Sequence, residues 1–196
     1  MISFGSVFSG AGLLDLGLVA AGLNPAWAIE QNEDAAASYR RLVGDHVLCA
    51  DVREVAATDL AAVDVLVGGP PCQGFSSAGQ QREDDPRNQL WREMYRLVAD
   101  RLPAHRPRFV MFENVPGMLK LGTHLEIMAA FASLGYSCDW RKLDAAWFGV
   151  PQHRKRVFIA CWLASSTPPP AAFGRRRPTA RLPICLALPM CRLMSL

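Results

Sequence analysis

The chain has 196 residues, of which 51% are apolar, and a formal net charge of +3. This length and composition are those of one folded domain with a hydrophobic core, and they exclude a disordered chain. No apolar run reaches the ~18–20 residues of a membrane-spanning helix, and the first residues do not form a signal peptide, so we expect a cytoplasmic protein without a membrane partner.

The charge is unevenly distributed along the chain. Residues 145–196 hold eight Lys or Arg residues and no carboxylate, whereas residues 1–144 hold the other 13 basic residues and all 18 acidic ones. A basic segment next to an acidic body is typical of a protein with a polyanionic partner, and equally of a solvated basic tail. The charge pattern leaves both interpretations open.

The six cysteines show neither a CxxC pair nor the spacing of a metal site. We therefore expect no bound metal, and reduced thiols as in a cytosolic protein. A redox or metal-binding function is the least favoured class.

Short apolar runs alternate with helical patterns along the chain. In chain order we predict a strand at 2–8, a helix at 13–21, strands at 25–29, 46–49 and 63–67 with a helix at 34–43, a helix at 88–102, a strand at 108–112, a helix around 121–132, and strands at 136–143 and 157–163. The helix at 34–43 lies between the strands at 25–29 and 46–49. This alternation predicts an α/β fold with a mostly parallel sheet and helices on both faces.

Five distinctive residues fall at or just after the ends of predicted strands. They are Gly10, Glu30, Asp51, Cys72 and Glu113. Ligands of such sheets bind at the carboxyl ends of the strands, so we expect these residues to lie along one functional edge.

The turn Phe8-Ser9-Gly10-Ala11-Gly12 follows the first strand and opens a helix. Glycines let the backbone approach a ligand, although the dinucleotide pattern GxGxxG is not met and a purely structural turn is the alternative. Glu30 can accept hydrogen bonds from ribose hydroxyls, and Asp51 from an adenine amino group. Each carboxylate alone reads as a surface residue, but their joint placement favours a nucleoside site.

Cys72 follows Gly68-Gly69-Pro70-Pro71 at a strand end. A lone cysteine is usually a small buried hydrophobe, but the prolines fix this backbone and hold the thiol in place. Glu113 ends the neighbouring strand, and a thiol near a carboxylic acid suits covalent attack on an activated ring. The alternative for Glu113 is an ordinary surface carboxylate.

Arg154 and Arg156 alternate just before the last predicted strand and therefore share a face. Two arginines there can hold a phosphate or a polarised carbonyl, and the alternative is an exposed basic turn.

Several motifs occur in one order along the chain. They are FSGAG at 8–12, Glu30, Asp51, GGPPCQGFS at 68–76, DPRNQL at 85–90, FENVPG at 112–117 and FGVPQHRKR at 148–156. Over about residues 3–163 this order and spacing resemble the DNA cytosine-5 methyltransferase family. The resemblance implies a Rossmann-like fold that binds S-adenosyl-L-methionine (AdoMet), double-stranded DNA as the partner, and flipping of the target cytosine out of the duplex.

By the same resemblance, the Cys72 thiolate attacks C6 of cytosine. Glu113 binds the ring N3 and amino group, while Arg154 and Arg156 contact the base carbonyl and nearby backbone. Asn114 holds the loop before Cys72. The positions that match the family's AdoMet site are Phe8, Gly10, Ala11, Gly12, Glu30, Gln31, Asp51, Val52, Gly69, Pro71 and Leu90. Gln31 stands where some members have an aromatic that stacks on adenine, which implies a weaker contact there.

The resemblance stops after Trp162. We expect residues 1–163 to form the AdoMet-binding catalytic domain and residues 164–196 to form a basic, Pro/Arg-rich, poorly ordered tail. Family members continue into a target-recognition region, so we expect a chain truncated before it.

Four functional hypotheses follow from the resemblance. The first is a DNA (cytosine-5-)-methyltransferase, as found in restriction-modification systems. The second is a weak or inactive AdoMet-binding remnant, and the third is a subunit that needs a separate recognition polypeptide. An RNA methyltransferase is the fourth.

Overall fold

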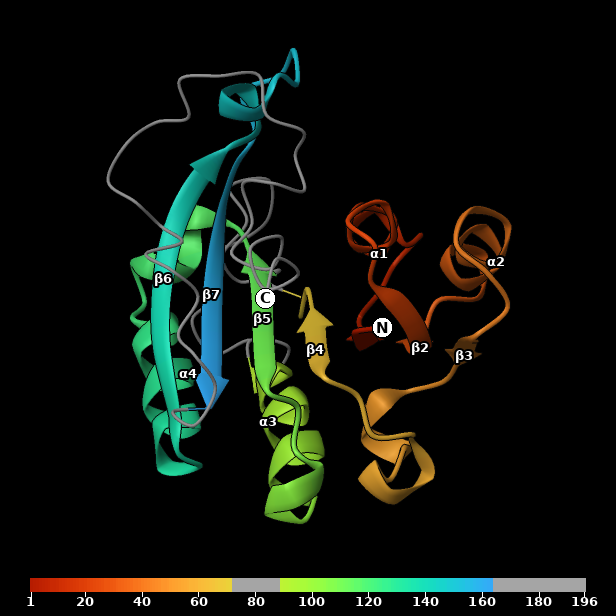
Figure 1. Cartoon of the computed structure of the whole chain (residues 1–196). Helices are drawn as coiled ribbons and strands as arrows, with labels where there is room; N and C mark the ends of the chain where they lie inside the picture. Colours follow the sequence, from red (N-terminus) through yellow and green to blue (C-terminus); the bar gives the residue numbers. More distant parts are fainter. Residues whose placement is uncertain (72–88, 164–196) are drawn as a thin grey trace.

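A seven-stranded sheet forms the centre of the computed structural model, which describes residues 1–71 and 89–163 (Figure 1). The strands are β1 (Ser3–Val7), β2 (Asn24–Glu30), β3 (Val47–Cys49), β4 (Val65–Gly68), β5 (Phe109–Asn114), β6 (Tyr136–Asp144) and β7 (Lys155–Leu163). Their order across the sheet is β3-β2-β1-β4-β5-β7-β6. β1 to β5 are parallel, whereas β7 runs antiparallel to both of its neighbours, β5 and β6. This confirms the predicted mostly parallel sheet.

In the described residues, four α-helices pack on the two faces of this sheet. They are α1 (Leu13–Ala20), α2 (Glu33–Leu42), α3 (Trp91–Ala99) and α4 (Thr123–Ser133). Figure 1 shows α1 and α2 near β1–β3, and α3 and α4 alongside β5–β7. All four helices were predicted, but α3 is shorter than the expected 88–102 range, and Leu90 is its N-cap.

The alternation of side chains along the strands explains why both faces carry helices. In β4, Val65 and Val67 pack in a cluster with Leu18 of α1, whereas Leu66 between them packs in a cluster with Met94 of α3. Successive strand residues point to opposite faces, so a run of apolar residues needs a cover on each side. The strand is buried throughout.

The last residue of β4 is a glycine because two elements approach it closely. A Cβ added at Gly68 would lie 2.6 Å from Sδ of Met94 and 2.8 Å from the carbonyl oxygen of Val7. These contacts are closer than real Cβ atoms tolerate, and one of them is to backbone that cannot move aside. The glycine therefore allows α3 and β1 to pack closely against the end of β4, just before the turn at Pro70 and Pro71.

A buried polar network joins β1, α1 and α2. Ser6 Oγ donates to Asp15 Oδ1 at 2.9 Å, and Tyr39 Oη donates to Asp15 Oδ2 at 2.7 Å. Tyr39 Oη also lies 2.9 Å from Nε2 of His46, and since its proton goes to Asp15, His46 Nε2 is the donor. Burial raises the pKa of Asp15 to about 6, and the two hydrogen bonds offset part of this rise.

Cys138 of β6 and Cys161 of β7 are directly opposite each other in the register, and a disulfide joins them. The prediction of reduced thiols is therefore wrong for this pair. Antiparallel pairing brings side chains that are 23 residues apart into contact, and no local spacing signals this. Cys49 is a free, exposed thiol.

No helix in residues 1–71 or 89–163 is long and apolar enough to cross a bilayer. Within these ranges there is also no group of three His, Cys, Asp or Glu side chains placed to hold a metal ion. Cys72 and residues 164–196, including the predicted tail, lie outside the described residues.

Candidate active site

The carboxyl ends of the parallel strands bring four of the five predicted edge residues together. Gly10 follows β1, Glu30 ends β2, Asp51 follows β3, and Glu113 lies near the end of β5. Two neighbouring cavities open along this edge. The fifth residue, Cys72, comes directly after Pro71 and lies outside the described part of the chain.

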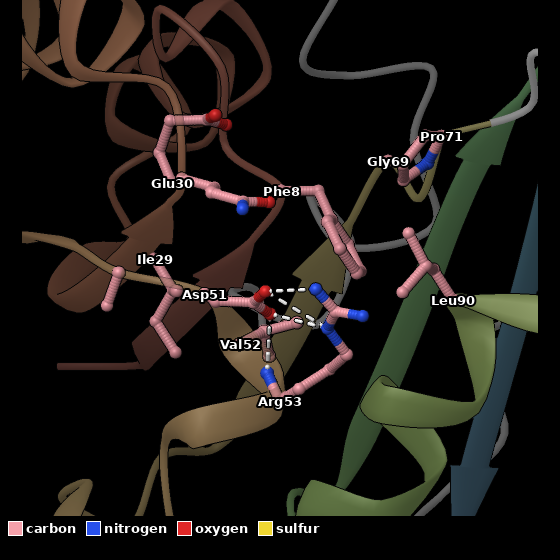
Figure 2. Close-up of a pocket in the computed structure, with 11 residues that line it drawn as sticks. Phe8, Ile29, Glu30, Asp51, Val52, Arg53, Gly69, Pro71 and Leu90 are labelled. Carbon is pink, nitrogen blue, oxygen red and sulfur yellow. Dashed lines mark hydrogen bonds and ion pairs between the residues drawn. The ribbon is translucent and has the colours of Figure 1, made fainter. Parts of the chain in front are cut away.

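The first cavity has a volume of about 530 Å³, within the usual range for small-molecule sites. It is lined by Phe8, Ile29, Glu30, Gln31, Ala50, Asp51, Val52, Arg53, Gly69, Pro71 and Leu90 (Figure 2). Eight of these residues belong to the predicted cofactor set, and they come from four strand ends and the N-cap of α3. Ile29, Ala50 and Arg53 were not predicted.

Glu30 is oriented by backbone amides on both sides of its carboxylate. Oε2 accepts from Gly10 N and Oε1 accepts from Asn32 N, each at 2.8 Å. The glycine turn thus fixes the carboxylate, which explains why Gly10 and Glu30 occur together. Each oxygen keeps a lone pair, so a vicinal diol such as ribose can still donate to both.

Asp51 is held by its near neighbour Arg53. The Asp51 carboxylate accepts from the backbone N and the Nε of Arg53, at 3.0 Å in each case, and Nη2 of Arg53 forms an ion pair with Oδ2. These hydrogen bonds keep the pKa of Asp51 below its usual range. Figure 2 shows the guanidinium lying inside the cavity. Nothing in the motif pattern had singled out Arg53.

The second cavity, of about 520 Å³, shares Phe8 and Gly69 with the first. Among its lining residues are the predicted Gly10, Ala11, Glu113, Arg154 and Arg156. A Cβ added at Gly69 would lie 3.5 Å from Oε2 of Glu113. The Glu113 carboxylate therefore stands at the wall that the two cavities have in common.

Glu113 and the two arginines meet because β7 runs antiparallel to β5. Glu113 pairs with Phe158, and Arg156 lies two residues earlier on the same face, with its Nε 2.9 Å from Glu113 Oε1. Burial raises the pKa of Glu113, and the charges of Arg156 and Arg154 offset part of that rise. A carboxyl group in this environment can hold a proton nearer to neutral pH than a solvated one.

Asp144 forms hydrogen bonds that fix the position of the segment carrying Arg154. Its Oδ1 accepts from the backbone N of Ala146 at 3.2 Å and of Arg154 at 3.1 Å, and Oδ2 lies 3.1 Å from Nδ1 of His153. Asp144 thus joins both ends of the connection between β6 and β7, which contains the turn η6 (Ala145–Phe148). Sequence reasoning missed Asp144 because its partners are up to ten residues away.

Asn114 was expected to hold the loop before Cys72, and its side chain contacts the turn that precedes this loop. Its Nδ2 donates to the carbonyl oxygen of Pro70 at 3.2 Å, and its Oδ1 accepts from Val115 N. The side chain is buried. It links the end of β5 to the Gly69-Pro70-Pro71 turn, which ends one residue before Cys72.

Two residues of the first turn have backbone or packing constraints that the sequence did not predict. Gly12 lines neither cavity; a Cβ added there would lie 2.6 Å from Cγ2 of Val43 and 2.8 Å from Cδ2 of Tyr39. A glycine is required at this position by the close packing and by a φ of 86°. Phe8 has a φ of 56°, a strained value for a residue with a side chain, and lines both cavities.

The chain is similar to known DNA methyltransferases. The model of the family described as C-5 cytosine-specific DNA methylase matches residues 2–180. Type II methyltransferase M.AgeI of Thalassovita gelatinovora is 41% identical over 165 residues, which cover 78% of this chain and 38% of that protein. M.AquIA of Picosynechococcus sp. is 39% identical over 175 residues, covering 79% of this chain and 69% of that protein. The chain thus spans about two fifths of the first relative.

Solved structures show the same fold. A candidate DNA modification methyltransferase encoded within an E. coli prophage has a TM-score of 0.71 at 30% identity, covering 84% of this chain and 47% of that one. The Dnmt2 methyltransferase of S. pombe has a TM-score of 0.71 at 22% identity, covering 85% of this chain and 52% of that one. The described sheet is therefore of the Rossmann-like type found in methyltransferases.

Proposed function

The chain belongs to the C-5 cytosine-specific DNA methylase family, and on this premise we propose that it transfers a methyl group from AdoMet to C5 of cytosine in double-stranded DNA. Members of this family use AdoMet as the methyl donor. The observation that carries the proposal is the pair of cavities that share Phe8 and Gly69, with a nucleoside-type set of carboxylates in one and Glu113 with two arginines in the other.

The first cavity fits the adenosyl part of AdoMet. Its volume suits a ligand of this size, and Glu30 keeps acceptors for ribose hydroxyls. Asp51 is the acceptor proposed for the adenine amino group, which would compete there with the side chain of Arg53. When bound, the cofactor supplies an electrophilic methyl group on a sulfonium. Phe8, Val52 and Leu90 supply apolar walls to the cavity.

The second cavity fits a flipped cytosine, which must leave the stack before its C6 can be reached. In the proposed reaction the Cys72 thiolate bonds to C6 and the ring electrons move toward C5, helped by a proton that Glu113 shares with ring N3. C5 then takes the methyl group as the sulfonium bond breaks. Loss of the C5 proton to a base restores the double bond and expels Cys72 as thiolate.

The two arginines act on the charge that this reaction moves. Arg156 contacts Glu113 directly, and Arg154 lines the same cavity. Their guanidinium groups can bind the base carbonyl and a neighbouring phosphate. Asn114 keeps the turn before Cys72 in place through Pro70.

A cytoplasmic location forms part of the proposal because bacterial restriction-modification methyltransferases are generally cytoplasmic. The Cys138–Cys161 disulfide is the observation that weighs against it, since cytosolic thiols are kept reduced.

Incubation with radiolabelled AdoMet and a cytosine-rich duplex tests the proposal, with Cys72→Ser and Glu113→Gln variants alongside. Label in DNA that is lost in Cys72→Ser supports it. Binding of S-adenosylhomocysteine (AdoHcy) without transfer supports a cofactor-binding chain that does not catalyse, and activity gained only with an added polypeptide supports a subunit. Label that enters RNA added to the same incubation, and not the DNA, would assign the RNA reaction instead. A chain that binds no AdoHcy would overturn all of these.

A further inference from the structure

Arg96 of α3 reaches across to the connection between β3 and β4. Its Nη2 donates to the carbonyl oxygen of Val52 at 2.8 Å and to that of Val55 at 3.0 Å. These acceptors lie more than 40 residues earlier in the chain. Hydrogen bonds from a charged donor are stronger than those between neutral groups.

The two carbonyls enclose the short turn η1 (Val52–Glu54). Asp51 is the N-cap of this turn, and Asp51, Val52 and Arg53 all line the first cavity. Arg96 itself does not line it. Asp51 O and Val52 O both accept hydrogen bonds within this turn, so we expect a displaced Val52 carbonyl to shift the backbone that carries the Asp51 carboxylate.

The guanidinium of Arg96 is itself held on α3. Its Nε donates to Glu93 Oε2 at 2.7 Å, and Nη1 lies 3.6 Å from Asp100 Oδ2. Leu90, the N-cap of this helix, lines the same cavity. The helix thus contributes one wall directly and fixes a second wall through Arg96.

We propose that Arg96 is a positioning residue for the adenosyl end of the methyl donor, an inference that rests on the proposed function of the first cavity. It sets the distance between the carboxylate of Asp51 and the apolar wall at Leu90. Groups that orient a binding residue in this way often affect ligand affinity nearly as strongly as the contacts themselves.

Arg101 provides a matched control. Its Nη2 donates to the carbonyl oxygens of Leu60 at 2.9 Å and Ala61 at 3.3 Å, in the same β3–β4 connection. Neither acceptor lines the first cavity. Arg96→Ala and Arg101→Ala therefore each remove two hydrogen bonds to this connection, but only Arg96→Ala releases the cavity wall. Arg96→Ala also removes the ion pairs with Glu93 and Asp100, which are partly exposed and contribute little to stability.

The test compares AdoHcy binding by calorimetry for the wild type, Arg96→Ala, Arg96→Lys and Arg101→Ala, at a temperature where thermal unfolding shows all four to be folded. We expect similar losses of melting temperature in the two alanine variants. The Kd should rise about fivefold or more in Arg96→Ala and stay nearly unchanged in Arg101→Ala, because about 1 kcal/mol of positioning corresponds to that factor. Arg96→Lys should be intermediate, since an ammonium replaces the planar fork.

Hydrogen–deuterium exchange without ligand gives a second readout. Glu54 N and Val55 N donate to Asp51 O and Val52 O, so a peptide that spans residues 51–55 should exchange faster in Arg96→Ala than in Arg101→Ala. Equal Kd changes in the two alanine variants, or unchanged exchange in Arg96→Ala, would overturn the inference alone. A wild type that binds no AdoHcy would instead overturn the proposed function, and with it the inference.

Discussion

Nε of Arg156 lies 2.9 Å from Oε1 of Glu113, although the two residues are 43 positions apart and belong to strands that run in opposite directions. This ion pair and the burial of Glu113 shift the pKa of its carboxyl group in opposite directions. Burial raises the pKa of Glu113, and the positive charge of Arg156 lowers it. The balance sets how readily this group holds the proton that the proposed reaction uses.

Replacement of Arg156 by glutamine should therefore raise the pKa of Glu113 further. The variant loses the charge that favours the ionised carboxylate, while the burial that disfavours it remains. Carboxyl NMR with labelled glutamate measures this pKa directly. Arg154→Gln is the control and should give a smaller rise, because Arg154 acts on Glu113 through space without a hydrogen bond. A Glu113 pKa that falls in Arg156→Gln would contradict the assigned balance.

The strained backbone of Phe8 predicts an unusual order of stability. Phe8→Gly should be more stable than Phe8→Ala by about 1 kcal/mol, because only glycine adopts a φ of 56° at little cost. Denaturant unfolding measures the difference, and both variants should bind AdoHcy more weakly since each removes the shared wall. The control is Val19, which is exposed on α1, where alanine should be more stable than glycine by a similar amount. If alanine is more stable than glycine at position 8 as well as at position 19, the backbone of Phe8 is not strained.

Asp15 should make stability fall as the pH rises from about 4 to about 6. Its pKa is raised from 3.8 to about 6 in the folded chain, so the folded state binds more protons than the unfolded state within this window. The loss should be about 3 kcal/mol, since each pKa unit corresponds to about 1.4 kcal/mol. Urea unfolding at several pH values tests this, and Asp15→Asn should show a flatter profile between these limits. If the unfolding free energy of Asp15→Asn depends on pH as strongly as that of the wild type, Asp15 is not the source of this dependence.

Gly12 should matter for folding rather than for direct contact with the cofactor. Gly12→Ala places a Cβ against Val43 and Tyr39 at a positive φ and should cost roughly 2–4 kcal/mol of unfolding free energy. AdoHcy affinity of the folded variant should change little. Gly17→Ala is the matched control because a Cβ there meets nothing within 4 Å, and it should stabilise α1 by up to about 1 kcal/mol. A large loss of affinity with normal stability in Gly12→Ala would restore the predicted binding role.

The sequence predicted all seven strands and all four helices because apolar runs and 3.6-residue patterns are local signals. It also placed Glu30, Asp51 and Glu113 on one edge, since the ends of parallel strands meet there. The direction of β7 and its insertion between β5 and β6 carry no such local signal. Its antiparallel course is what brings Arg156 to Glu113.

Two of the features that sequence reasoning missed depend on partners that are distant in the sequence. Arg96 contacts carbonyls more than 40 residues away, and the Cys138–Cys161 disulfide follows from strand register. Arg53 is the exception, because it lies beside a predicted residue, but its side chain could equally have pointed to solvent. Gly12 was assigned to the cofactor by its motif, whereas its surroundings are side chains of α2 and the residue that follows it.

The position of β7 has a consequence for synthesis of the protein on the ribosome. β7 inserts between β5 and β6, so the latest described strand to be synthesised takes the position next to the edge strand and not the edge itself. A nascent chain can form the first cavity as soon as α3 has emerged, but Arg154 and Arg156 reach Glu113 only when β7 closes this long-range pairing. All residues that line the cavity proposed for AdoMet are therefore synthesised before the two arginines of the cavity proposed for cytosine.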